Sequence, residues 1–358
     1  MELIGDIAYL EHLVHAYSIL TCDLHVNAAE LSASLGGITS PPVSTLAAVL
    51  LLAGGLALVL VAAEKLVEGA AGTARGFGLS AFVVGVVFLG FDPENLGVGA
   101  VAGYEGVAGI ALGSVLGAAM VAIALALGVT ALIAPMALRP VPLPVVALPV
   151  AAVLLFGLLA LDGRLSRLDG AVLLAAYAAA IVCVFALARR GVTLEPREAK
   201  ELAEAERLGR WRAAGLLVLA LAAILAGSEM IVRASEVLIG RLGISDTLYG
   251  MTLLAFLVSI EEVARELPAA LKGRPEITLG NVVGSVFAFF LMNAGVIALV
   301  RPVPVAREVL VFHLPAALAT TLVIAALLRA GRFPRWAGAL LVALYLGFLA
   351  GSWLLEGL

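Results

Sequence analysis

Ten stretches of mainly apolar residues, each about long enough to cross a bilayer, run through the chain and constrain its fold. A membrane-spanning helix needs about 20 such residues, and only helices or closed barrels satisfy their backbone groups in lipid. The composition agrees, because 63% of residues are hydrophobic and only 13% are charged, whereas about a quarter are charged in soluble domains. We therefore predict an all-α integral membrane protein with about ten transmembrane helices. The stretches lie near residues 43–63, 79–98, 107–134, 144–162, 168–188, 212–233, 244–263, 277–300, 308–328 and 336–355.

The two halves of the chain repeat each other. Residues 62–85 match 227–250 at a constant offset of 165, and residues 109–135 match 276–302 at an offset of 167. Each repeat contains five predicted spans, and an odd number makes the second copy enter the membrane from the opposite side. Inverted repeats of this kind are typical of secondary transporters, which bind their substrates near the midplane where the repeats meet. The identical pairs are Glu64/Glu229, Val67/Val232, Gly78/Gly243, Ser80/Ser245 and Gly85/Gly250, then Gly113/Gly280, Val115/Val282, Gly117/Gly284, Gly128/Gly295 and Pro135/Pro302.

These patterns predict four regions and an orientation. Residues 1–42 form an extramembrane segment with an amphipathic helical stripe, 43–188 the first five-helix repeat, 189–211 a charged linker and 212–358 the second repeat. If the first span exits into the cytoplasm, 16 of the 22 Lys and Arg residues fall in inner loops and 6 in outer loops. The positive-inside rule then places both termini outside and the linker in the cytoplasm. We expect a multi-pass protein of the cell (inner or plasma) membrane.

The seventh apolar stretch, LLAFLVSIEEV at 253–263, runs directly into two glutamates, Glu261 and Glu262. A charge at the centre of a bilayer costs several kcal/mol, so such residues are usually functional. Ser259 lies three residues before Glu262 and therefore shares its helix face. Asn281 and Ser285 are four residues apart in the next span. These hard oxygen donors favour Na⁺, Ca²⁺ or a similar ion.

The SIEE sequence at 259–262, followed by GNVVGS at 280–285, resembles the cation/calcium exchanger superfamily, the sodium/calcium exchangers and their prokaryotic relatives. In that family each of two inverted five-helix repeats carries a Gly-Thr-Ser-Leu-Pro-Glu stretch and then a Gly-Asn-x-x-Gly-Ser-Asn stretch. The resemblance implies that Glu262 takes the place of the acidic cation ligand, that Ser259 matches the family's serine, and that Glu261 stands where proline is usual. It extends from about residue 45 to the C-terminus.

The first repeat departs from this pattern. It reads FLGFDPENLGVG at 88–99, and three registers place the acidic position on Gly97, Asn95 or Glu94. We prefer Glu94, with Asp92 and Asn95 as helpers, because the site needs an acid. Glu94 and Glu262 are then the expected metal ligands.

Several ligands usual in the resembling family are replaced here. Ser114 stands for an asparagine, Ala118 for a serine and Val286 for the final asparagine of the second motif, while Ala122 and Phe289 follow one turn after the motifs. This implies a smaller site, with fewer cations or with protons as the coupling ion.

The resemblance therefore implies a secondary active antiporter that exchanges Ca²⁺ or another cation for Na⁺ or H⁺ by alternating access, and not an enzyme. We expect no cofactor apart from the transported cations; the partners are inorganic cations and the lipid bilayer, with no nucleic acid and no assigned oligomeric state. Glu64 and Glu229 are gating candidates. Alternatively, Glu64 snorkels to the membrane surface and Glu229 pairs with Arg233 one turn on.

Two other functions remain open. Glu261, Glu262 and Arg265 resemble the Glu-Glu-x-x-x-Arg motif of intramembrane glutamate proteases, but the spacing is one residue short, so we expect Arg265 to lie off the shared face. Those enzymes also need intramembrane histidines, and only His313 is available; we expect it to be a structural histidine. The missing first-repeat ligands also suit a degenerate member that serves as a scaffold or sensor.

Overall fold

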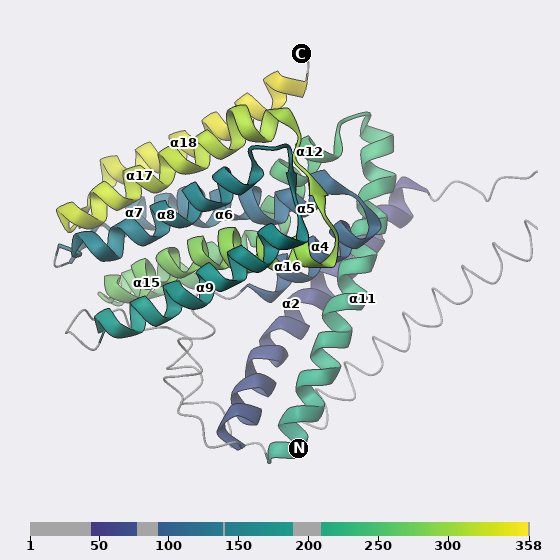
Figure 1. Ribbon diagram of the computed structural model, residues 1–358, viewed down its shortest axis with the longest axis horizontal. Helices are drawn as coiled ribbons and strands as arrows, with labels where there is room; N and C mark the ends of the chain where they lie inside the picture. Colours follow the sequence, from purple (N-terminus) through teal and green to yellow (C-terminus); the bar gives the residue numbers. More distant parts are fainter. Residues whose placement is uncertain (1–43, 77–91, 139, 189–208, 357–358) are drawn as a thin grey trace, which may run out of the picture. The chain divides into compact units, whose positions relative to one another are not determined.

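The computed structural model describes residues 44–76, 92–138, 140–188 and 209–356, and nearly all of them are helical (Figure 1). The predicted N-terminal segment 1–42 and most of the charged linker lie outside the described residues. The chain divides into two compact units. One contains residues 44–76 and 209–243, and the other contains the remaining described residues.

The first unit is a pair of long helices, α2 (Thr45–Gly76) and α11 (Arg210–Leu242). They run antiparallel, because a Cβ on Gly55 would lie 2.8 Å from the carbonyl oxygen of Gly227 and one on Gly69 would lie 2.7 Å from the backbone nitrogen of Leu217. Such close approach is possible only where small residues face each other. Gly243 ends α11 in a left-handed conformation with φ of 68°, as is common after a helix C-terminus.

The second unit contains both ion-site motifs and the remaining helices. Several of its spans are continuous helices with π-helical turns, labelled η, in their interior. Its first-repeat elements are α4 (Pro93–Glu105), α5 (Ala108–Leu112), η1 (Gly113–Gly117), α6 (Ala118–Met120), η2 (Val121–Ala126), α7 (Leu127–Ile133), β1 (Met136–Ala137), α8 (Leu143–Ala160), β2 (Arg164–Leu165) and α9 (Arg167–Ala188). Its second-repeat elements are α12 (Asp246–Tyr249), η3 (Gly250–Leu254), α13 (Ala255–Ser259), α14 (Glu261–Leu271), α15 (Pro275–Phe287), η4 (Ala288–Asn293), α16 (Ala294–Val300), β3 (Val303–Pro304), η5 (Val309–His313), α17 (Leu314–Ala330), β4 (Arg332–Phe333) and α18 (Arg335–Glu356).

Within the described residues, eight helices are long and apolar enough to cross a membrane, and a bent helix pair adds a ninth. These nine agree with nine of the ten predicted stretches. The remaining stretch, 79–98, lies mostly outside the described residues, and α4 begins near its end at Pro93. The bent pair runs from Asp246 to Ser259 and from Glu261 to Leu271, with an angle of 48° at the break. The apolar pattern did not indicate this break, which falls beside the two glutamates.

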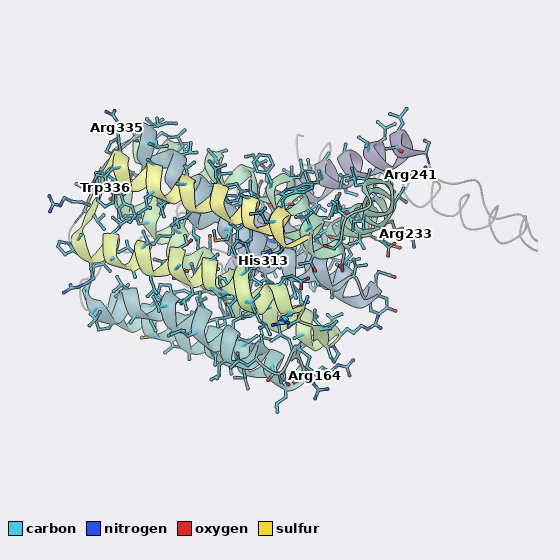
Figure 2. The ribbon with its side chains drawn as sticks, turned by 90° about the horizontal axis from the view of Figure 1, so that it is seen from above. Arg164, Arg233, Arg241, His313, Arg335 and Trp336 are labelled. Carbon is cyan, nitrogen blue, oxygen red and sulfur yellow. The ribbon has the colours of Figure 1, made fainter. Side chains whose placement is uncertain are left out.

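Two short antiparallel strand pairs reveal that the repeats are inverted. Strand β1, just after α7, pairs with β4 in the α17–α18 turn, and β3, just after α16, pairs with β2 in the α8–α9 turn. The equivalent helices α7 and α16 therefore end at opposite ends of the unit. Figure 2 shows the same relation, since Arg164 beside α9 and Arg335 at the start of α18 lie at opposite ends of the bundle. The predicted inverted topology follows directly from this pairing.

The centre of the second unit is a close crossing of two helices from different repeats. A Cβ on Gly113 would lie 2.3 Å from the carbonyl carbon of Gly250, and one on Gly109 would lie 2.2 Å from the backbone nitrogen of Thr247. The carboxylate of Asp246 accepts a hydrogen bond of 2.8 Å from the backbone nitrogen of Gly109. The glycines thus let backbone pack on backbone, which holds the two repeats in a fixed relation.

Candidate cation site

Two helices of the second unit begin at carboxylates, one in each repeat. Helix α4 starts at Pro93, with Glu94 in its first turn, and Asp92 caps it by accepting a 2.8 Å hydrogen bond from the backbone nitrogen of Asn95. Helix α14 starts at Glu261, with Glu262 beside it. The N-terminus of a helix carries partial positive charge, which stabilises nearby carboxylates, and the half-helices of transporters use this at ion and substrate sites.

The guanidinium of Arg265 joins these carboxylates. Its Nη2 lies 3.0 Å from Oε1 of Glu94, and its Nη1 lies 3.1 Å from Oε1 of Glu262. Nη2 also forms an ion pair of 2.5 Å with Glu261, one helical turn earlier on the same helix. The side chains of Glu94 and Glu262 are each only 2% exposed, whereas those of Arg265 and Glu261 are each 27% exposed. The ion pair of Glu261 with Arg265 therefore marks the less buried edge of the cluster.

Amide side chains connect the rest of the cluster. The Nδ2 of Asn95 donates 2.8 Å hydrogen bonds to Oδ2 of Asp92 and to Oγ of Ser259. The Nδ2 of Asn281 donates a 3.0 Å bond to Oε2 of Glu262. All these groups are buried, and buried polar groups are stable only when they are paired in this way. Of the residues predicted from the sequence, the structure thus brings together Asp92, Glu94, Asn95, Ser259, Glu261, Glu262 and Asn281.

Two predicted residues do not join this network. The hydroxyl of Ser114 donates a 2.8 Å bond to the carbonyl of Ala111 in its own helix, and it packs where a Cβ on Gly99 of α4 would lie. Ser285 is buried one turn after Asn281 on α15. In the described part of the chain, neither serine hydroxyl bonds a carboxylate of the cluster.

Sequence reasoning missed two charged members. Arg265 was expected off the face of the glutamates, and that expectation is wrong, because the spacings of three and four residues bring it onto Glu262 and Glu261 as on any α-helix. Glu266 lies one turn after Glu262 and is fully buried, and neither of its carboxylate oxygens has a hydrogen-bond partner. The i,i+4 spacing of Glu266 from Glu262 was the available signal. Thr278 packs nearby, donating a 3.0 Å bond to the carbonyl of Glu266.

Among the residues that the structure describes, no three His, Cys, Asp or Glu side chains are close enough together to hold a metal ion. One buried acceptor is nevertheless available, because Oε2 of Glu94 has no hydrogen-bond partner. The arrangement is a set of carboxylates from both repeats, three of which share one tethered guanidinium.

The remaining candidates lie elsewhere. Glu64 is exposed on α2, and Glu229 on α11 forms an ion pair of 2.5 Å with Arg233, the pairing that was the alternative to a gating role. The ring nitrogens of His313 (Figure 2) lie 3.0 Å from Oγ of Ser352 and 3.1 Å from the carbonyl of Glu308. His313 is therefore a structural histidine, as predicted.

Comparisons with known proteins agree with this architecture. The chain is 31% identical over 258 residues to a putative antiporter, CaxA, of Alkalimonas amylolytica, covering 69% of this chain and 79% of that protein. It is 32% identical over 270 residues to the inner membrane protein YrbG of Escherichia coli strain K12, covering 72% and 81%. A solved structure of the sodium-calcium exchanger NCX_Mj is 26% identical, with a TM-score of 0.55, and covers 86% of this chain and 99% of that one.

The family described as sodium/calcium exchanger protein matches residues 47–186 and 212–354, which together cover most of both predicted repeats and every member of the buried cluster. The inverted repeats, the carboxylates at two helix N-termini and these matches lead to one assignment. The chain belongs to the sodium/calcium exchanger family of membrane proteins.

Proposed function

We propose that this protein is a secondary active antiporter that exchanges Ca²⁺ or a similar hard cation for Na⁺ or H⁺. The observation that carries the proposal is the meeting of Glu94 and Glu262, one from each repeat, at 3.0 and 3.1 Å from the same guanidinium. Carboxylates from both repeats can form a common site at the junction of the repeats, which alternating access exposes to each side of the membrane in turn. The names of relatives as antiporter and sodium/calcium exchanger support the same reading.

In this proposal Glu94 and Glu262 bind the cation directly. Asp92, Asn95, Ser259 and Asn281 orient these carboxylates or supply further oxygens, and hard cations such as Ca²⁺ prefer such ligands. Glu261 belongs to the edge of the site, and Ser114 and Ser285 are outer candidates that would need a rearrangement to reach an ion. A gating role for Glu64 and Glu229 on the other unit is part of the same proposal.

The proposed location is the cell membrane, with both termini outside and the 189–211 linker in the cytoplasm. The positive-inside count supports this orientation, and the relative named as an inner membrane protein supports the compartment. Neither the glutamate protease nor the scaffold reading is favoured by a relative or by the site. His313, the intramembrane histidine that a protease would need, is bonded to Ser352 and to the Glu308 carbonyl.

Purified protein in liposomes tests the proposal. Uptake of Ca²⁺, Na⁺ or K⁺ is measured with an opposing cation gradient, with and without a pH gradient. We expect gradient-driven exchange by the wild type and its loss in Glu262→Gln and Glu94→Gln, because each change removes a buried ligand charge. Glu105→Gln is the matched control, since Glu105 is exposed at the other end of α4. Absence of exchange by folded wild-type protein for every tested cation would contradict the proposal.

A further inference from the structure

We propose that the guanidinium of Arg265 is a tethered cation that competes with the transported cation for Glu94 and Glu262, and that Glu261 holds it when it is displaced. This inference rests on the proposed transport function for its purpose, but its first consequence, competition for binding, can be measured without transport. It concerns a residue that the sequence motifs of the family do not assign to the ion site.

The first support is the position of the positive charge. Each of the two buried carboxylates has one oxygen on the guanidinium, Glu94 through Nη2 and Glu262 through Nη1. These are the groups that a transported cation would need. A cation that approaches both must displace the guanidinium, because two positive charges at the same buried oxygens repel each other strongly in a medium of low polarity.

The second support is a further carboxylate, that of Glu261, with which Arg265 can stay paired after displacement. Glu261 precedes Arg265 by four residues on α14, and both side chains are about a quarter exposed, in contrast to the two buried carboxylates. A glutamate four residues before a basic residue is a favourable helical pair. The guanidinium can therefore leave Glu94 and Glu262 while it keeps one carboxylate partner, so its displacement does not leave a charge without compensation.

The third support is a buried carboxylate oxygen that accepts no hydrogen bond. Oε2 of Glu94 is buried without a hydrogen-bond partner. By contrast, the two carboxylate oxygens of Glu262 accept from Arg265 and Asn281, and Oδ2 of Asp92 accepts from Asn95. A buried carboxylate oxygen with no donor favours an added positive charge. Together these contacts describe a site in which a cation of the chain already pairs with both buried glutamates and one carboxylate oxygen remains an available acceptor.

Competition predicts that substitutions of Arg265 and of Glu261 change the cation affinity in opposite directions. Arg265→Gln removes the competitor, so cations should bind more tightly. If the guanidinium occupies the carboxylates for nine tenths of the time, its removal raises the apparent affinity about tenfold. Glu261→Gln removes the holding partner, so the guanidinium stays on the buried carboxylates and cations should bind more weakly. In the Arg265→Gln background the Glu261 change should have a smaller effect than in the wild type, because Glu261 then has no arginine to hold.

The experiment measures binding of Ca²⁺ and of Na⁺, each alone, to full-length protein in detergent by equilibrium dialysis with the radioactive ion. The variants are Arg265→Gln, Glu261→Gln and the double variant, with Arg301→Gln as the matched control. Arg301 lies outside the cluster and donates a 2.9 Å bond to the carbonyl of Tyr104. If Arg265→Gln does not fold, the double variant remains informative, because it removes one charge of each sign and leaves Glu94 and Glu262 in place.

Tighter binding by Arg265→Gln or by the double variant, with the control unchanged, supports the competitor role. Unchanged or weaker binding by folded variants overturns it and makes Arg265 a residue that only orders the carboxylates. Transport in liposomes separates this result from the proposed function. If the variants bind cations more tightly but neither they nor the wild type exchange them, the antiporter is rejected and the competitor role of Arg265 is retained. If the wild type exchanges cations and the variants bind them as the wild type does, the antiporter is retained and the competitor role is rejected.

Discussion

The side-chain amide of Asn95 donates a 2.8 Å hydrogen bond to the hydroxyl of Ser259, a residue 164 positions further along the chain. Both residues are 1% exposed, and they lie beside the helix start of α4 and the helix break after α13. This bond links the ion-site segment of the first repeat to that of the second. It therefore couples the positions of Glu94, which directly precedes Asn95, and Glu262, which follows Ser259 by three residues.

Loss of this bond should destabilise the junction between the repeats. We expect Asn95→Ala or Ser259→Ala to lower the free energy of unfolding by about 1–3 kcal/mol, because each leaves a buried polar partner unpaired. A double-mutant cycle should give a coupling energy of about 0.5–1.5 kcal/mol, measured by denaturant unfolding in detergent micelles. Thr321→Ala is the control, since its hydroxyl bonds the Ala317 carbonyl in its own helix. A coupling no larger than that between Asn95 and Thr321 would count against the link.

We expect the buried carboxyl group of Glu266 to lower the stability of the folded protein but to support cation transport. A fully buried carboxylate with neither oxygen bonded costs stability, and an apolar side chain of similar size removes that cost. We expect Glu266→Met to unfold at a higher temperature than the wild type, by an amount equivalent to about 1 kcal/mol or more. Its cation exchange should be slower, because a carboxyl group one turn from Glu262 is lost. A destabilised Glu266→Met protein would show that this carboxylate has a stabilising partner.

The glycine crossing between the repeats should tolerate no side chain. Gly113→Ala places a methyl group 2.3 Å from the carbonyl carbon of Gly250, where the backbone must shift, at a cost of about 1–3 kcal/mol. Gly347→Ala on α18 is the matched control, because nothing lies within 4 Å of its added Cβ. There we expect a gain of about 0.5–1 kcal/mol from reduced chain entropy. Thermal unfolding of both variants checks the expectation, and equal effects would argue against a tight crossing.

The orientation of the repeats can be tested by cysteine labelling. In a background with Cys22→Ser and Cys183→Ser, we expect Arg164→Cys to react with a membrane-impermeant maleimide on intact cells. Arg332→Cys should react only after the membrane is opened, because its strand, β4, pairs with β1 at the other end of the unit. Labelling of both from outside would contradict the inverted topology, and the reverse pattern would contradict only the predicted orientation.

The amino-acid pattern alone was enough to predict the membrane class, the repeats and the acid of the second repeat. Hydropathy depends on local composition, so nine predicted spans coincide with helices or with the bent pair. Identities at a constant offset, such as Gly113 with Gly280, revealed the repeats without any structure. Glu262 stood out because a carboxylate inside an apolar span is costly.

The first-repeat register needed the tertiary structure. Three alignments placed the acidic position on Gly97, Asn95 or Glu94, and the sequence offered only the chemical argument that an acid is required. The structure brings Glu94 to the guanidinium and Asn95 to Ser259, so both belong to one cluster. Gly97 lies on the same helix and has no side chain to offer.

The partner of the carboxylates was also decided only by tertiary structure. Helical spacing alone could have paired Arg265 with Glu261 and Glu262, but its contact with Glu94 joins residues 171 positions apart. Such a contact depends on how two repeats dock, and local periodicity carries no information about docking. The same holds for the bond of Asn95 with Ser259. The apolar pattern fixes which segments enter the membrane, and the packing of glycine against glycine fixes which charges meet there.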